Sequence, residues 1–81
     1  MSSTVLIADD AGFMRVMLKE ILADMGLTVA GEAADGHQAV RLYRELRPDL
    51  VALDLTMPRL DGVGALKEIL QENPQAIVIV I

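Results

Sequence analysis

Three uninterrupted apolar runs, separated by segments long enough for a helix, limit the folds open to this chain more than any other feature. The runs are residues 5–8 (VLIA), 50–53 (LVAL) and 76–81 (AIVIVI). Their apolar residues are consecutive rather than alternating, which is typical of strands covered on both faces in a parallel sheet. Residues 27–32 (LTVAGE) are a weaker candidate for a further strand.

The segment after the first run has the pattern of an amphipathic helix. Apolar residues recur at positions i, i+3, i+4 and i+7, and Gly26 supplies a stop because glycine adopts the left-handed conformation at least cost. The side chains expected to face the core are Met14, Met17, Leu18, Ile21, Leu22 and Met25. We interpret the methionines among them as core residues.

Two further helices are predicted between the later strands. The second begins near Asp35, which can cap it, and ends before Pro48, because proline disfavours helical conformation in the preceding residue. The third begins at about Gly62 and ends before Pro74. The expected core-facing residues are Val40, Tyr43 and Leu46 in the second helix, and Val63, Leu66, Ile69 and Leu70 in the third.

The elements therefore alternate as βαβαβαβ over residues 1–81, with no linker or low-complexity run between them. Alternation at these lengths predicts a single α/β domain with a parallel sheet, three helices and right-handed crossovers. A slice of a β/α barrel shares the strand pattern, but it does not account for the placement of the acidic residues.

Charge and cysteine content exclude several classes of function. The net charge is −5, and no basic stripe could displace counterions from phosphates, so nucleic-acid binding is not expected. The absence of cysteine removes disulfides and thiolate metal sites and fits a reducing cytoplasm. The first ten residues, MSSTVLIADD, have no basic region and reach two acids after a short apolar run. They predict neither a signal peptide nor a membrane span, so we expect a cytoplasmic protein.

Three aspartates follow strands that are expected to be neighbours. Asp9 and Asp10 come directly after the first apolar run, and Asp54 follows the run at 50–53. If these two strands are adjacent, the carboxylates converge at the carboxyl edge of the sheet, where open parallel sheets bind ligands. Carboxylates so close repel one another unless a cation lies among them. Oxygen ligands with no Cys or His nearby favour a hard ion, Mg²⁺ above others.

Simpler roles for the polar residues stay open. Asp10 could cap the first helix and Asp54 could stabilise a turn, although neither role explains why three acids meet at one edge. Asp61 with Gly62 fits a turn and a helix cap better than a metal ligand. His37 is interpreted as a solvated residue. The same interpretation applies to three arginines that recur every three residues, Arg41, Arg44 and Arg47.

The motifs around the acids are similar to those of a known family. VLIADD at residues 5–10, GEAADG at 31–36, and an aspartate followed by LTMP and then DG at 54–62 resemble the receiver domains of two-component response regulators. The stretch ADDAGFMRVMLKEIL, residues 8–22, is most similar to the stand-alone chemotaxis members. The resemblance implies a flavodoxin-like, doubly wound sheet with strand order 2-1-3-4-5, which periodicity alone does not give.

The resemblance also implies a reaction and a site. Receiver domains accept a phosphoryl group from a histidine kinase on an aspartate in a Mg²⁺-dependent reaction, as signalling domains rather than enzymes. Asp54 matches the phosphoacceptor, Asp10 and Asp54 match the direct metal ligands, and Asp9 matches the acid that holds a metal-bound water. Thr56 matches the position whose backbone carbonyl completes the metal site. The turn that opens the third helix is matched by Asp61 and Gly62, after Met57 and Pro58.

Complete receivers continue through a fourth helix, a fifth strand and a fifth helix. The family pattern therefore predicts that this chain, ending at Ile81, is truncated after its fourth strand, with order 2-1-3-4. In the family, a hydroxyl residue and a lysine contact the phosphoryl group. Both come after the fourth strand. Lys19 and Lys67 are on predicted helices and cannot replace that lysine.

Two hypotheses follow for the function. One is a chemotaxis receiver phosphorylated at Asp54, with a histidine kinase and the flagellar motor switch as partners. The other is a truncated or engineered fragment that does not switch and is phosphorylated weakly at most. Such a fragment is expected to form a homo-oligomer, because its last strand is apolar, uncharged and unpaired at one edge.

Overall fold

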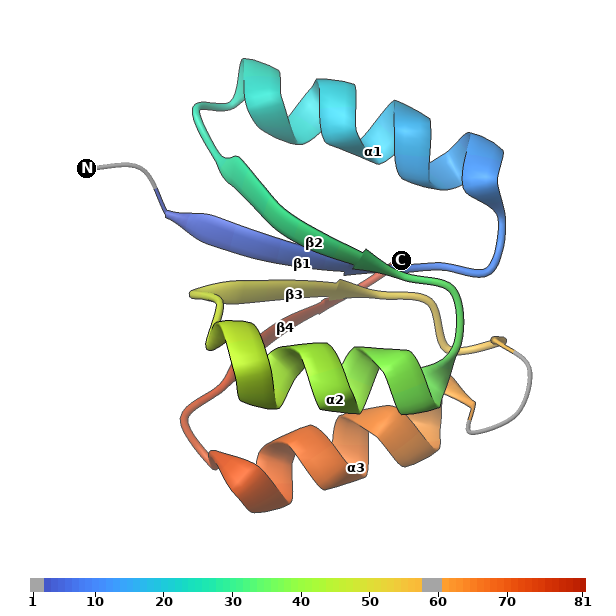
Figure 1. Cartoon of the computed structure of the whole chain (residues 1–81), viewed down its shortest axis with the longest axis vertical. Coiled ribbons are helices and arrows are strands. Elements are labelled where there is room, and N and C mark those ends of the chain that lie inside the picture. The colour runs from blue at the N-terminus through green and yellow to red at the C-terminus, as the bar shows by residue number, and fades with distance from the viewer. Residues whose placement is uncertain (1–2, 58–60) are drawn as a thin grey trace.

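The computed structural model describes residues 3–57 and 61–81. The strands are β1 (Thr4–Ala8), β2 (Thr28–Ala33), β3 (Leu50–Leu53) and β4 (Ile77–Val80), and the helices are α1 (Gly12–Asp24), α2 (Gly36–Leu46) and α3 (Gly62–Glu72). They alternate along the chain as the sequence predicts (Figure 1). None of the helices in the described ranges is long and apolar enough to cross a bilayer.

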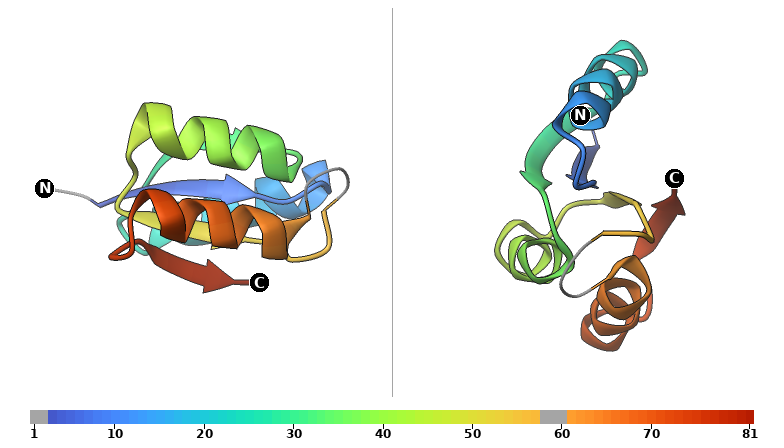
Figure 2. Two further views of the ribbon diagram at one scale, coloured as in Figure 1. Left: turned by 90° about the horizontal axis from the view of Figure 1, so that it is seen from below. Right: turned by 90° about the vertical axis from the view of Figure 1, so that its right-hand side faces the viewer.

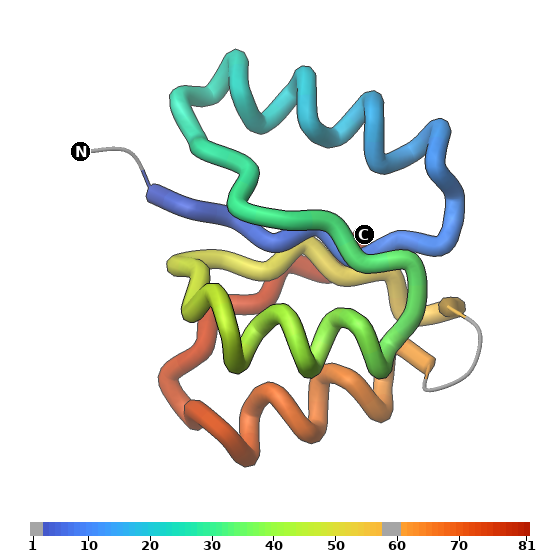
Figure 3. The backbone as a smooth tube through the Cα atoms, in the orientation of Figure 1, coloured from blue at the N-terminus to red at the C-terminus, as the bar shows by residue number. Residues whose placement is uncertain are grey.

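The strands form one parallel sheet in the order β2-β1-β3-β4. The chain adds β2 on one side of β1 and then returns past β1 to add β3 and β4 on the other side (Figure 3). Because right-handed crossovers running in opposite directions along a sheet lie on opposite faces, α1 covers one face while α2 and α3 cover the other (Figure 2). The predicted α/β class and the order 2-1-3-4 are confirmed.

The main core lies between the sheet and the layer formed by α2 and α3. Its strand residues are Leu6, Ala8, Ala33, Val51 and Leu53, and its helix residues include Val40, Tyr43 and Ile69. The Tyr43 hydroxyl accepts a hydrogen bond of 3.0 Å from Asn73 Nδ2, which joins the carboxyl ends of the two helices. The prediction that Val40, Tyr43 and Ile69 face the core is therefore confirmed, and Leu66 is partly buried against it.

Three residues expected in this core are exposed instead. Leu46, Val63 and Leu70 have exposed fractions of 39%, 44% and 37%. Each lies at the margin of an apolar stripe.

The helix α1 is less buried than predicted. All of its 13 residues are described, and none is buried. Met17, Ile21 and Met25 are 40%, 50% and 68% exposed, so the interpretation of these methionines as core residues is wrong. The physical reason is that α1 lies alone on its face and packs mainly on β2 and β1. The other three expected residues are partly buried: Met14, Leu18 and Leu22.

Local signals set the helix ends. Asp35 Oδ1 accepts from the Gln38 amide at 2.9 Å, and Gln38 Oε1 accepts from the Ala34 amide at 2.9 Å, so α2 begins with a reciprocal capping pair. Gly26 has φ of +85°, as expected of a glycine that stops a helix. Asp10 does not cap α1, because the cap position is Ala11 and no side chain bonds the first turn there. That alternative for Asp10 is wrong.

A polar pair joins the starts of β1 and β3 at the amino edge of the sheet. Asp49 Oδ2 accepts from the Thr4 amide at 2.8 Å and from the Thr4 hydroxyl at 3.2 Å. The Thr4 hydroxyl oxygen in turn accepts from the Asp49 amide at 3.1 Å. These bonds fix the register of the two strands that carry the aspartates at their other ends.

Candidate functional site

The backbones of two acids continue the strand ladders past the ends of β1 and β3. The Asp9 amide donates to the Ala33 carbonyl at 3.0 Å, and the Asp54 amide donates to the Ala8 carbonyl at 2.9 Å. Each acid is therefore tied to the neighbouring strand before its side chain leaves the sheet. The positions of the two carboxylates follow from strand pairing rather than from a free loop.

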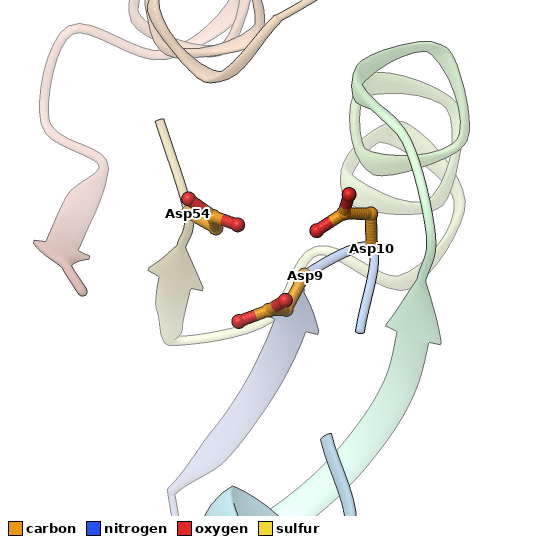
Figure 4. Close-up of side chains that lie close together, drawn as sticks. All are labelled: Asp9, Asp10 and Asp54. Carbon is orange, nitrogen blue, oxygen red and sulfur yellow. The ribbon is translucent and has the colours of Figure 1, made fainter. Parts of the chain in front are cut away.

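The carboxylates of Asp9, Asp10 and Asp54 converge between the ends of β1 and β3 (Figure 4). Each offers an oxygen, and these oxygens all lie within 4.8 Å of one another. Asp9 is buried, Asp54 is partly buried and Asp10 is exposed. The convergence predicted from the strand order is confirmed. Residues 3–57 and 61–81 enclose no pocket at this edge.

The spacing of the oxygens fits a small hard cation. Mg²⁺ binds oxygen at about 2.1 Å in octahedral geometry, so oxygens that ligate one ion are about 3–4.2 Å apart. The 4.8 Å limit found here allows two direct carboxylate ligands after a small inward movement, with the third acid reaching the ion through water. Three carboxylates that offer only oxygen ligands suit Mg²⁺, a hard cation that prefers oxygen.

The two oxygens of Asp54 have different surroundings. Oδ1 accepts from the Thr56 amide and from the Thr56 hydroxyl, both at 2.9 Å. The turn after β3 is thus stabilised by Asp54, as the simpler alternative proposed. Among the described residues, Oδ2 has no hydrogen-bond partner, so one oxygen holds the turn while the other is available to a ligand.

Thr56 is exposed and lies two residues after Asp54. Its side chain and amide face Asp54, and the role of its carbonyl as a metal ligand stays a prediction. Asp61 caps α3, accepting from the Gly64 amide at 2.8 Å, as expected. Met57 is buried, and Pro58 lies outside the described residues.

Gly62 has a role at the site that sequence reasoning missed. A β-carbon built on this residue would overlap the Asp54 carbonyl oxygen and the Leu55 α-carbon. Its amide donates to the Leu55 carbonyl at 3.1 Å. The start of α3 therefore packs directly on the backbone of the acid, and only glycine fits there. The DG pair gave a cap signal, but nothing in it indicated this contact.

Arg15 was also missed. Its Nη1 donates to the Asp9 backbone carbonyl at 2.6 Å, and its Nε contacts Glu32 Oε1 at 3.2 Å. Asp9 itself accepts from the Ala11 amide through Oδ1 at 2.9 Å. An arginine in the first turns of the helix after an acid pair was the available signal, but its partners are set only by the packing of α1 on β2.

The other charged residues singled out in the sequence lie away from the acids. His37 is exposed on α2. Arg44 and Arg47 pair with Glu72 across α2 and α3 at 3.0 and 3.8 Å, and Arg41 approaches Glu45 at 4.0 Å. All three arginine side chains are more than half exposed, as expected of a solvated face.

These acids, at the carboxyl edge of a parallel sheet with this strand order, define a protein class. The family model of the response regulator receiver domain matches residues 5–81, so the chain belongs to that family. Among curated relatives, the chemotaxis protein CheY of Thermotoga maritima is 52% identical over 80 residues, covering 99% of this chain and 67% of the relative. CheY of Bacillus subtilis is 53% identical over 79 residues, covering 98% of this chain and 66% of the relative.

Solved structures agree with the fold. The CheX–CheY–BeF3–Mg²⁺ complex of Borrelia burgdorferi contains a chain that matches with a TM-score of 0.94 at 38% identity, over 96% of this chain and 60% of that chain. The response regulator domain of Thermotoga maritima CheB matches with a TM-score of 0.89 at 39% identity, over 99% of this chain and 61% of that chain. This chain thus spans about two thirds of the length of its relatives.

Proposed function

We propose that this chain is a phosphoacceptor of two-component signalling, in which Asp54 takes a phosphoryl group from a histidine kinase. The observation that carries the proposal is the meeting of Asp9, Asp10 and Asp54 at one sheet edge, with an oxygen of Asp54 open to a ligand. We also propose that residues 1–81 form one receiver domain. In this proposal the chain accepts the phosphoryl group as a signalling domain and is not an enzyme.

The reaction uses groups that the fold already holds in place. Asp54 Oδ2 forms a bond to phosphorus as the phosphorus–nitrogen bond of the phosphohistidine breaks, and the departing imidazole takes a proton from solvent. Thr56 holds Oδ1 and so fixes the direction in which Oδ2 points. Mg²⁺, when bound, neutralises charge on the acid and on the incoming phosphoryl group. Asp10 and Asp54 would ligate it directly, Asp9 would hold a bound water, and the Thr56 carbonyl would complete the shell.

The relatives support a place in chemotaxis. Two CheY proteins match nearly the whole chain, and a structural neighbour is a CheY in complex with CheX, BeF3 and Mg²⁺. By this likeness we propose a cytoplasmic protein with a histidine kinase as donor and the flagellar motor switch as output partner. No role in nucleic-acid binding is proposed, given the net charge of −5.

Intact-mass measurement tests the proposal. The chain is incubated with Mg²⁺ and acetyl phosphate, and the mass should rise by one phosphoryl group. Asp54→Asn should abolish the gain, because its amide can still accept from Thr56 but cannot attack phosphorus. Asp61→Asn is the matched control and should be phosphorylated like the unaltered chain. A gain that persists in Asp54→Asn, or a chain that is never modified, would contradict the assignment.

A second candidate is self-association without switching. It is favoured by the exposure of β4 and the residue after it, where Ile77, Ile79, Val80 and Ile81 are 57%, 51%, 52% and 46% exposed. These side chains are apolar, and the outer edge of β4 has no neighbouring strand among the described residues. A second copy of the chain is the proposed occupant, in a homo-oligomer.

A further inference from the structure

We propose that Arg15 positions the two acids at the end of β1 by holding the peptide group that joins them. The inference rests on the proposed function, since it concerns the geometry of the metal ligands. Asp9 and Asp10 share one peptide group, and its carbonyl oxygen is the acceptor of the 2.6 Å bond from Arg15 Nη1. Fixing that oxygen fixes the plane of the peptide, and therefore the direction in which Asp10 leaves the chain.

Three hydrogen bonds restrain Asp9, through its amide, its carboxylate and its carbonyl. Its amide donates to Ala33 at the end of β2 at 3.0 Å, and its carboxylate accepts from the Ala11 amide at 2.9 Å. Arg15 in α1 supplies the third through the carbonyl. Without the bond from Arg15, the peptide group between Asp9 and Asp10 can rotate, because strand pairing holds only the amide of Asp9.

Glu32 on β2 holds the guanidinium in its orientation. Its Oε1 accepts from Arg15 Nε at 3.2 Å, and its Oε2 contacts Lys19 Nζ at 3.1 Å. Glu32 stands opposite Ile7 in the β1–β2 register, two residues before Asp9. The Arg15 side chain is 22% exposed, and Glu32 is 35% exposed, so this pair is partly shielded from water.

The contact requires an arginine rather than any cation. A guanidinium has donors in one plane, so it can bond a carboxylate through Nε and a carbonyl through Nη1 together. A lysine ammonium in the same place keeps the charge but cannot span both acceptors in a fixed plane. Charge and geometry also predict opposite effects on a cation. A nearby positive charge repels Mg²⁺, whereas positioned ligands attract it.

The experiment measures Mg²⁺ binding by amide NMR titration at constant ionic strength, with Mg²⁺ alone as the probe. Arg15→Gln and Arg15→Lys should each weaken the affinity by about tenfold, the lower end of the range for residues that orient metal ligands. Arg44→Gln is the matched control, because Arg44 also pairs with a glutamate, at 3.0 Å, but packs on the α2–α3 side. Its affinity should equal that of the unaltered chain.

Glu32→Gln extends the test. It should weaken Mg²⁺ binding less than Arg15→Gln does, and the double variant should be no worse than Arg15→Gln alone, because both act through one network. Tighter binding in Arg15→Gln, or full affinity in Arg15→Lys, would mean that Arg15 acts through its charge only and would overturn the proposal.

A readout without metal separates this inference from the proposed function. Hydrogen exchange of the Ala11 amide, which bonds Asp9 Oδ1, should become faster in Arg15→Gln but not in Arg44→Gln. Exchange of the Val51 amide in the core strand β3 reports whether each variant stays folded. If the unaltered chain binds no Mg²⁺, the proposed function fails, and Ala11 exchange alone decides the positioning role: unchanged exchange overturns it.

Discussion

The two oxygens of Asp54 differ in their contacts, which allows one residue to serve both the turn and the proposed reaction. One oxygen holds the turn through Thr56, and the other has no hydrogen-bond partner among residues 3–57 and 61–81. A carboxylate in this arrangement keeps its position when a ligand arrives, because the turn bonds need not break. The proposed nucleophile is thus preorganised by a residue two positions further along the chain.

Metal binding gives a prediction at this scale. Mg²⁺ should raise the thermal stability of the chain, and at ten times its Kd the gain should be about 1.4 kcal/mol. In a domain of this size, each kcal/mol of added stability raises Tm by about 4–8 °C. Asp54→Asn should lose most of the Mg²⁺-dependent gain, because it removes one charged ligand but keeps an acceptor for Thr56.

The matched control for this experiment is Asp61→Ala. It removes the α3 cap and lowers stability by about 1 kcal/mol, but by the same amount with and without Mg²⁺. Scanning calorimetry at several Mg²⁺ concentrations measures both effects. Equal Mg²⁺ gains in the unaltered chain and in Asp54→Asn would count against a shared metal site.

Gly62 gives a second prediction. Gly62→Ala should cost roughly 1–3 kcal/mol, because a β-carbon would overlap the backbone of Asp54 and Leu55. Gly12→Ala is the control, since a β-carbon there meets only the flexible Arg15 side chain at 3.5 Å. Urea unfolding of both variants gives the comparison. A Gly62→Ala chain as stable as Gly12→Ala would show that α3 can move away freely.

At residue scale, the sequence could predict the acids but not their neighbours. Asp9, Asp10 and Asp54 were found because each follows an apolar run, and strand ends are readable from the pattern. Arg15 and Gly62 contact backbone atoms of residues outside their own helices. Such contacts depend on how α1 and α3 sit on the sheet, which side-chain periodicity does not encode.

At the scale of elements, periodicity predicted the helices well and their burial only in part. The apolar stripe of α1 has the spacing of a packed helix, yet none of its residues is buried. Burial depends on how many elements share a face, and a local pattern cannot count them. The apolar stripes of α2 and α3 contain buried residues, because the two helices lie side by side and cover each other's flanks.

The strand order shows the same limit. Each apolar run predicted a strand, but the order β2-β1-β3-β4 came from the resemblance to receiver domains. Continuous hydrophobic strands pair equally well in several orders, since no side chain in them selects a neighbour. The Thr4–Asp49 pair is one feature that does select, because it joins β1 to β3 by polar bonds.

For the whole molecule, the exposed apolar surface leads to a prediction on assembly. The chain mass is 8.8 kDa. Light scattering coupled to size exclusion at micromolar concentration should give a dimer or larger species, because β4 and α1 leave large apolar side chains in water. Two-fold symmetry is the commonest arrangement for such contacts.

Ile79→Lys provides the matched test of that assembly. A lysine on an exposed strand opposes pairing and packing by a second copy, so this variant should shift toward the single-chain mass. Leu46→Lys on α2, also at an exposed apolar residue, is the control and should leave the assembly unchanged. A folded, stable species with the mass of one unaltered chain would refute self-association.

The Thr4–Asp49 pair has a consequence for how the sheet opens. Because it joins β1 and β3 at one end and the aspartates meet at the other, the two strands should open as a single cooperative unit, a foldon, rather than one at a time. The distance between the two ends is about 15 Å for strands of this length. Binding of Mg²⁺ at the acids should therefore slow hydrogen exchange of the Asp49 amide at the opposite edge. Asp49→Ala should uncouple the two ends, so that exchange near Thr4 no longer responds to the ion.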